Sequence, residues 1–551
     1  MISKLPPELL SHIFSNFETD SETLFSCCLV SREWSVFAVS WLWKKPFHIC
    51  PTQNRTLLVR TCYKISPLRS PYDKTEEPLF DYASFLQYLD FHEVYEAAWH
   101  HYIYSGKWDD LFLLYEEESE ESETEESEES DESDEYYESE EPDESDEYYE
   151  SHESIFNNLL KRKRKRKDDD ENWTIEELSQ SDVDYFKNEI LSITSKLCQL
   201  FLLNSNKIIS LDLCTSEMEN GNNINEEWIN IFKLENATSA LANIKKFVSG
   251  GLYDIQSIIN IMINICHDIE ILKIFFEDQN ELYYSFSNLI KGQKNLKELQ
   301  IINMEKYKFN EIINSSLSYQ SHSLRILDFE DCEFLNNIPF KELSLLQNLE
   351  SLILINCDIV EYNHQHKSLD FSFPSLKNIH FDMKSLFIEE TERLISCSMK
   401  LEEISLIGTE IHLSNIFDII AINGFNIKIL DVCIGDHYIK SIIPIFIQCQ
   451  KLESVSFQMN VLDREEIRIS MIDIAKNIPK SLSNLNLMIS VNINDIKTFF
   501  SHFDGLLKIF GFRTYSYKNI NIEEYTKRKC VNYKVVQEEG GGDQHYIIFK
   551  K

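Results

Sequence analysis

Apolar residues recur in a fixed pattern over the C-terminal two thirds of the chain. Positions 1, 4 and 6 of a six-residue unit are apolar, and the unit returns at intervals of 25 to 33 residues. A degenerate copy has Leu241 and Ile244 at positions 1 and 4 but Lys246 at position 6. The complete copies begin at Ile208, Ile269, Leu296, Leu324, Leu349, Leu376, Leu401, Ile427, Leu452, Leu482 and Leu507. A period of this length predicts a repeat array.

Each unit predicts one short strand and one helix. Positions 4 and 6 point to the same side of a strand, because side chains alternate along it. The residues between units have helical spacing, as in Ile411, Ile416, Ile419 and Ile420. One such pair cannot close a core, since a buried Leu stabilises by ~1.5–3 kcal/mol while ordering costs ~1.5 kcal/mol per residue. Stacking predicts an α/β solenoid, a horseshoe with parallel strands inside and helices outside.

The first residues of the chain predict three short helices. A proline pair and Glu8 suit the first turn of a helix. Asp20 or Ser21 is placed to cap a second helix, and Ser31 a third. An apolar stripe with helical spacing runs along Leu9, Leu10, Ile13, Phe14 and Phe17, and a second along Trp34, Phe37 and Trp41. Fewer than 50 residues are marginal alone, so the surplus apolar residues predict a partner surface.

This N-terminal pattern resembles the F-box, which reads L-P-x-E-L-L-x-x-I-F, then L-V-x-R-x-W, then L-W. The resemblance implies docking to a Skp-type adaptor and through it to a cullin. The residues it assigns to adaptor binding are Leu5, Pro6, Glu8, Leu9, Leu10, Ile13, Phe14, Leu29, Val30, Trp34, Leu42 and Trp43. A plain three-helix cap of the solenoid is the alternative, and the distance to the first repeat at Ile208 argues against it.

The repeating unit resembles leucine-rich repeats, in which position 9 is often Asn or Cys. Cys332, Cys357 and Asn460 match that position, Thr409 is a substitute, and three units depart from it, with Glu277, Met304 and Lys384. The two resemblances together imply an F-box/leucine-rich-repeat protein of the fungal type. Such a protein is a non-catalytic substrate receptor of a ubiquitin ligase, with the repeats binding an unknown protein substrate.

The net charge of −39 is concentrated in one low-complexity segment. Between Glu116 and Glu153 there are 23 acidic residues and no Lys or Arg, and DESDEYYES occurs there twice. Dense like charge with few aliphatic residues predicts disorder. Its serines and tyrosines suit acid-directed kinases, although a solubilising spacer is the plainer interpretation. We divide the chain into an F-box (1–47), a connecting helical segment (48–115), the disordered tract with its basic run (116–171) and about twelve repeats (172–551).

A run of seven basic residues follows the acidic tract. It resembles a nuclear-import signal that an importin would bind, and a solvated charge run is the alternative. Neighbouring carboxylates would repel phosphate, so nucleic acid is disfavoured as a partner. We therefore expect the nucleus, the cytoplasm or both as the location. The run comprises Lys161, Arg162, Lys163, Arg164, Lys165, Arg166 and Lys167.

Other sites are not indicated by the sequence. No run approaches 18 apolar residues, so we expect no membrane span. The 13 cysteines form no C-x-x-C pair, which favours reduced thiols. No nucleophile, phosphate-binding or zinc-protease motif is present, so we expect no catalysis and no cofactor. His364 and His366 lie close together in a polar loop, and we interpret them as surface residues rather than as metal ligands.

Three classes of function remain open from the sequence. The first is the substrate receptor, the second is a scaffold that binds the adaptor without degradation, and the third is a nuclear chaperone whose acidic tract binds basic proteins. Position 5 of each unit is expected to face the concave side of the horseshoe. Asp328, His380 and Asp431 stand at this position and are our candidate substrate-binding residues.

Overall fold

We describe the protein from a computed structural model. The structure describes residues 6–65, 79–104, 180–214, 230–250, 255–276, 282–304, 316–335, 338–360, 370–383, 388–407, 414–434, 442–459, 464–490, 493–505, 507–514, 532–537 and 545–550. The acidic tract, the basic run and Leu5 lie outside these ranges, and the predictions that fall on them remain predictions.

Three helices form the N-terminal unit, as the sequence predicts: α1 (Pro7–Ser15), α2 (Ser21–Cys28) and α3 (Arg32–Leu42). The Asp20 side chain caps α2 by accepting a hydrogen bond from the Thr23 amide at 2.9 Å, and Ser31 caps α3 through the Trp34 amide at 3.2 Å. Each cap supplies an acceptor that the first turn of a helix lacks. The unit has its own small core, made of Leu10, Phe14, Leu24 and Ala38.

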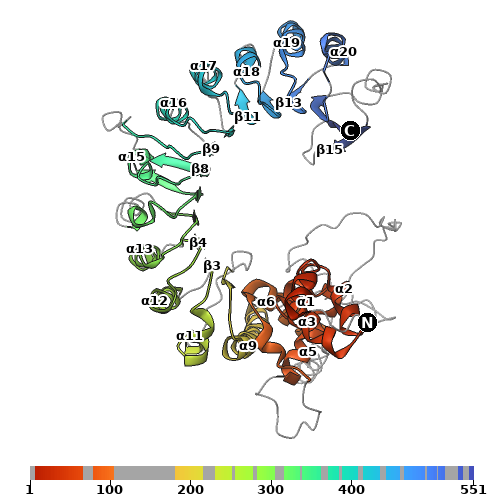
Figure 1. Cartoon of the computed structure of the whole chain (residues 1–551), viewed down its shortest axis with the longest axis vertical. Coiled ribbons are helices and arrows are strands. Elements are labelled where there is room, and N and C mark those ends of the chain that lie inside the picture. Colours follow the sequence, from red (N-terminus) through yellow and green to blue (C-terminus); the bar gives the residue numbers. More distant parts are fainter. Residues whose placement is uncertain are drawn as a thin grey trace, which may run out of the picture.

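A curved sheet follows, with its strands on the inside of a horseshoe and its helices on the outside (Figure 1). Neighbouring strands from β1 to β14 pair in parallel, and an antiparallel hairpin of β15 and β16 closes the C-terminal end. The strands are β1 (Tyr88–Asp90), β2 (Ser210–Asp212), β3 (Lys246–Ser249), β4 (Ile271–Phe275), β5 (Glu298–Ile302), β6 (Ile326–Glu330), β7 (Glu333–Leu335), β8 (Ser351–Val360), β9 (Asn378–Met383), β10 (Glu403–Ile407), β11 (Ile429–Ile434), β12 (Ser454–Met459), β13 (Asn484–Ser490), β14 (Ile509–Thr514), β15 (Asn532–Gln537) and β16 (His545–Lys550).

Helices cover the outer side of this sheet, in most of the connections between successive strands. They and the linking helices are α4 (Pro46–Ile49), η1 (Thr52–Asn54), α5 (Arg55–Ile65), η2 (Tyr82–Phe85), α6 (Phe91–Tyr104), α9 (Gln180–Asn204), α11 (Glu235–Leu241), α12 (Ile255–Ile265), α13 (Leu282–Gly292), η3 (Leu317–Gln320), α15 (Phe340–Leu343), α16 (Ile388–Cys397), α17 (Ser414–Asn423), α18 (Ile442–Gln448), α19 (Arg464–Asn477) and α20 (Ile493–His502). No described helix is long and apolar enough to cross a membrane.

The predicted repeat units are confirmed as strands. The strand of every complete unit begins two residues after the apolar residue at position 1, as β10 begins two residues after Leu401. The described apolar residues at positions 1, 4 and 6 belong to one continuous core, which extends from Phe47 to Phe510. Stacking therefore buries the apolar positions that a single strand and helix could not bury alone.

The frame assigned to the degenerate unit was wrong by three residues. Ile244 stands at position 1, because β3 pairs Phe247 with Leu211 and with Leu272 at position 4. Position 6 is Ser249, which is fully buried, and its hydroxyl has no hydrogen-bond partner among the described residues. The unit looked degenerate because a small polar residue replaces the usual leucine.

The solenoid also begins earlier than the sequence indicated. Leu86, Leu89 and Phe91 carry the same pattern, all three are buried, and β1 pairs in parallel with β2. Residues 48–115 were predicted to be a connecting helical segment, yet they contain the first repeat strand and its helix α6. The acidic tract and the basic run therefore interrupt the first repeat, between α6 and α9, instead of preceding the array.

The N-terminal unit is joined directly to this first repeat. In each repeat the carbonyl at position 2 accepts two backbone hydrogen bonds from the next repeat, as Gln87 does from Ile209 at 2.8 Å and Ser210 at 3.0 Å. The carbonyl of Lys44, just after α3, accepts from Gln87 at 2.9 Å and from Tyr88 at 3.1 Å in the same way. The N-terminal unit therefore covers the first edge of the sheet, and its distance in sequence from Ile208 does not separate it from the solenoid.

Aromatic packing strengthens this junction. The Trp43 ring lies 4.9 Å from that of Tyr82, and Phe47 meets Phe201 of α9 edge-on at 5.7 Å. Phe47 is buried and belongs to the core of the solenoid rather than to that of the N-terminal unit. The two units therefore share apolar surface as well as backbone hydrogen bonds.

We expect Phe47→Ala to uncouple the N-terminal unit from the repeats. Removing a buried Phe costs about 3–5 kcal/mol through lost burial and the cavity left behind. Calorimetric melting should therefore show a separate, earlier transition for the N-terminal helices. Phe25→Ala is the matched control, because Phe25 of α2 is 60% exposed. Equal melting of both variants would contradict the shared core.

The turns that leave the strands use residues suited to them. Asn303, Asp331 and Asn356, at position 8 of three successive repeats, have φ values of 57°, 52° and 50°, a region that Asn and Asp tolerate. At position 9, the thiols of Cys332 and Cys357 each donate to a carbonyl of the preceding repeat at 3.4 Å. Both thiols are buried, as the resemblance implies for this position. Asn460, Thr409, Glu277 and Lys384 lie outside the described residues.

Candidate functional site

Two surfaces are candidates for binding a protein: the N-terminal helices and the concave side of the sheet. On the first, Leu9 and Ile13 share one side of α1 and are 50% and 37% exposed. Leu29 and Val30, in the turn between α2 and α3, are 74% and 62% exposed. Exposed apolar groups of this size on a folded unit of three helices are typical of a protein-binding surface.

The predicted docking set divides between this surface and the core. Pro6 and Glu8 are exposed along with the four apolar residues above. Leu10 and Phe14 are 2% and 0% exposed and lie in the small core of the N-terminal unit, so their assignment to adaptor contact stays a prediction. The rings of Phe14 and Trp34 pack edge-on at 5.5 Å. Leu42 packs on the same small core and Trp43 on the solenoid core. These four inward residues pack the helices on one another and on the first repeat.

The concave surface is a row of position-5 side chains on neighbouring parallel strands. Asp328 of β6 pairs with Ile353 of β8, which pairs with His380 of β9. His380 then pairs with Ser405 of β10, and Ser405 pairs with Asp431 of β11. The three predicted residues therefore lie in one row that crosses the sheet, in which adjacent strands are about 4.8 Å apart. Ser405 lies between two of them.

The carboxylates in this row are partly buried. Burial raises the pKa of Asp431, and a hydrogen bond from Ser456 opposes that shift. Burial also raises the pKa of Asp328 to about 6, with a further contribution from Glu330, while Lys273 opposes it. One carboxylate oxygen of Asp328 is buried without a hydrogen-bond partner among the described residues. Such acids bind a proton or a cation more readily than surface acids do.

We expect Asp328→Asn to stabilise the protein at pH 8 and to have little effect near pH 4. The folded-state pKa of about 6 lies above the unfolded value, so folding favours the protonated form. The stability that this proton provides is present at low pH and is lost as the pH rises through about 6. Asparagine resembles the protonated acid at every pH.

Thermal melts of both proteins between pH 4 and pH 8 measure this effect. Asp418→Asn, on the exposed side of α17, is the control, because it makes the same substitution away from the concave face. If the difference in melting temperature between wild type and Asp328→Asn stays constant with pH, the pKa of Asp328 is not raised in the folded protein.

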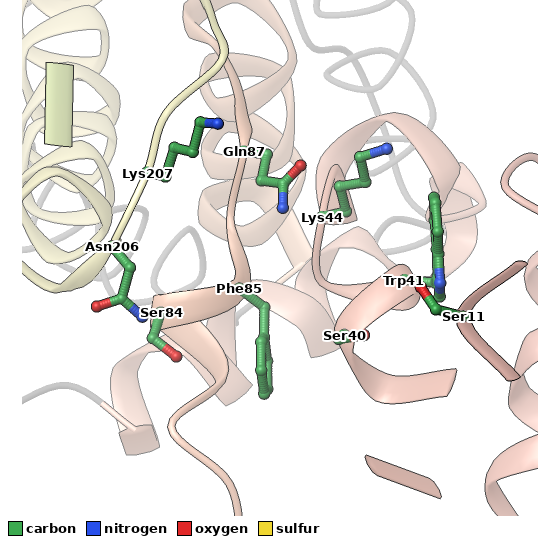
Figure 2. A pocket seen from close by; sticks show the side chains of 9 residues that line it. All are labelled: Ser11, Ser40, Trp41, Lys44, Ser84, Phe85, Gln87, Asn206 and Lys207. Carbon is green, nitrogen blue, oxygen red and sulfur yellow. The ribbon is translucent and has the colours of Figure 1, made fainter. Parts of the chain in front are cut away.

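A pocket of about 320 Å³ lies at the junction between the N-terminal unit and the first repeat (Figure 2). Lys44 and Lys207 contribute its charges, with Gln87 between them, and no carboxylate lines it. The Lys44 ammonium is held by Glu18 at 3.2 Å and lies 4.3 Å from the centre of the Trp41 ring. The lining is completed by Ser11, Ser40, Trp41, Ser84, Phe85 and Asn206.

The described residues include no group of three or more side chains placed to hold a metal ion. His364 and His366 lie outside them. The cysteines whose side chains the structure describes are free thiols. The sequence also places Ser405 at position 5, although it was not chosen as a candidate, whereas Asp382 and Glu403, which share the concave face with the predicted residues, were not considered. The alternation of side chains along β9 and β10 could have identified them, because positions 3, 5 and 7 face the same way.

Comparison with known families agrees with this arrangement. Residues 2–49 match the family described as F-box-like. Residues 295–407 match the leucine-rich repeats described as plant disease resistance protein RPS2-like. The chain thus carries an F-box-like domain at its N terminus and leucine-rich repeats after it, as both resemblances implied. Units of these two kinds are typically adaptor and interaction domains.

Among solved structures, an internalin of Listeria monocytogenes is similar at 16% sequence identity. The match covers 56% of this chain and 88% of that one, with a TM-score of 0.31. The search of curated proteins finds no match.

Proposed function

We propose that this chain, which carries an F-box-like domain followed by leucine-rich repeats, is the substrate-recognition subunit of a Skp–cullin–F-box ubiquitin ligase. The F-box-like domain would bind the Skp-type adaptor, and the repeats would bind the protein to be modified. The chain itself would perform no chemistry. The observation that carries the proposal is the outward apolar set of Leu9, Ile13, Leu29 and Val30 on the domain that matches the F-box-like family.

The junction supports such a role. A receptor increases reaction rate by holding its substrate at a fixed position relative to a reactive group, which raises the effective concentration. The backbone bonds from Lys44 and the packing of Phe47 against Phe201 join the docking domain to the repeats without a flexible linker. A substrate on the concave face would therefore keep its orientation relative to the adaptor.

Affinity purification of the tagged full chain from cells tests the proposal. The adaptor and a cullin should be recovered, and at least one co-purifying protein should have a longer half-life when the chain is depleted. Recovery of adaptor and cullin without any such protein would favour the non-degradative scaffold. Failure to recover the adaptor would exclude both.

A nuclear chaperone of basic proteins is the competing function, and the 23 acidic residues between Glu116 and Glu153 favour it. Deleting residues 116–154 separates the two hypotheses. Histones lost from the purification, with no change in adaptor, would support the chaperone. Unchanged adaptor and unchanged substrate turnover would leave the receptor as the better account.

A further inference from the structure

The concave face over β9 to β13 carries a connected row of polar side chains. His380, Ser405, Asp431, Ser456 and Asn486 pair as neighbours on five successive strands. The amide of Asn486 lies 3.5 Å from the Ser456 hydroxyl, and that hydroxyl hydrogen-bonds to the Asp431 carboxylate. The row is therefore already ordered on one side of Asp431.

The other side of Asp431 is not satisfied. Ser405 is 6% exposed, and its hydroxyl has no hydrogen-bond partner in the part of the chain that the structure describes. Buried hydroxyls in proteins nearly always have a partner. Position 5 directs this side chain to the concave face, between His380 and Asp431. A polar group from outside the chain would complete the hydrogen bonding.

The charge of this region indicates which group fits. Asp382, Glu403 and Asp431 place three carboxylates on β9, β10 and β11. No Lys or Arg stands at positions 3, 5 or 7 of strands β8 to β13. Among the described residues no Lys or Arg forms an ion pair with these three carboxylates, although His380 exerts an attractive charge on Asp431. On β3 and β4, by contrast, Lys246 and Lys273 stand on the concave side. The region therefore has an excess of carboxylates and no Lys or Arg to balance them.

We propose that this part of the concave face binds the side chain of a lysine or arginine in an extended basic segment of a partner protein. The ammonium or guanidinium would donate to the Asp431 carboxylate and to the Ser405 hydroxyl oxygen. Five strands span about 19 Å, which an extended segment of roughly six residues covers. Under the proposed function this partner is the substrate, and on that reading the substrate is recognised through a basic segment.

Peptide binding to the purified full chain tests the site. The probe is a fluorescein-labelled peptide of alternating lysine and serine, beside a peptide in which glutamine replaces lysine. The lysine peptide should bind saturably and the glutamine peptide should bind at least tenfold more weakly. Asp431→Asn should weaken lysine-peptide binding at least tenfold, and Ser405→Ala about threefold, with thermal melts confirming that both variants fold.

Asp418→Asn is the matched control, because it removes an exposed carboxylate from α17 on the outer side and should leave binding unchanged. The acidic tract would also attract lysine peptides. Because Asp431→Asn and Asp418→Asn both keep this tract, the difference in peptide affinity between them measures the contribution of the concave site. Equal affinity for Asp431→Asn and Asp418→Asn would overturn the site. Adaptor binding is measured on the same preparations. If the chain does not bind the adaptor, the proposed function is wrong but the site is unaffected. If the chain binds the adaptor and Asp431→Asn binds the lysine peptide as tightly as wild type does, the site is wrong but the proposed function is unaffected.

Discussion

Adaptor binding should fall by roughly 100-fold or more when Leu29 and Val30 are both replaced by glutamate. These residues are 74% and 62% exposed, so the changes remove no internal packing. Truncated hot-spot residues cost about 2 kcal/mol or more each, and 1.4 kcal/mol is a factor of ten. Two buried carboxylates in the complex would add a desolvation penalty. The measurement is co-purification of the Skp-type adaptor, followed by titration calorimetry with the purified partner.

Leu57→Glu provides the control for this experiment. Leu57 of α5 is 64% exposed but lies beyond the residues that match the F-box-like family. It should leave adaptor binding unchanged. If the double variant still binds the adaptor normally while its melting profile is native, the docking surface lies elsewhere on the chain.

The largest loss of stability should come from Leu352→Asp. Leu352 is fully buried at position 4 of β8, between Leu327 and Ile379 of the neighbouring strands. Losing a buried leucine costs about 2–5 kcal/mol, and an unpaired buried charge adds to that. Because each repeat is stabilised by its neighbours, the damage should spread to β6 and β9. Chemical denaturation and hydrogen exchange measure both effects.

Ile353→Asp is the control, because it places the same aspartate at the next residue of β8. Ile353 stands at position 5, faces the concave side and is only partly buried. Ile353→Asp should lower the free energy of unfolding by only about 1 kcal/mol, because the new carboxylate reaches water and lies beside His380. Similar losses for the two variants would mean that the alternation along β8 is misassigned.

The sequence alone determined the repeat, its period and its strands. The apolar residues at positions 1, 4 and 6 must be buried on one side, and only stacked neighbours can bury them. The register of β10 and the other predicted strands follows directly from Leu401 and its equivalents. The helix caps at Asp20 and Ser31 were also predictable, because they rest on hydrogen bonds within three residues.

The tertiary structure decided what depends on residues distant in the sequence. Leu86, Leu89 and Phe91 carry the repeat pattern, but the acidic tract separates them from the next unit, so the constant period is broken. Only the pairing of Tyr88 with Ser210 identifies the first strand. The frame that begins at Ile244 was likewise identified only by the pairing of β3 with its neighbouring strands, because the polar residue Ser249 stands at position 6, where the pattern requires an apolar one.

The candidate sites show the same division. The apolar stripe predicted that α1 packs on something, but Leu9 and Leu10 are adjacent, and the packing of α3 against α1 decides which one is buried. At the concave face the sequence gives position 5 of each repeat, whereas the burial of Ser405 between His380 and Asp431 arises from the stacking of three strands. Local periodicity fixes which side of an element is apolar, and contacts between distant segments fix which side chains remain available for binding.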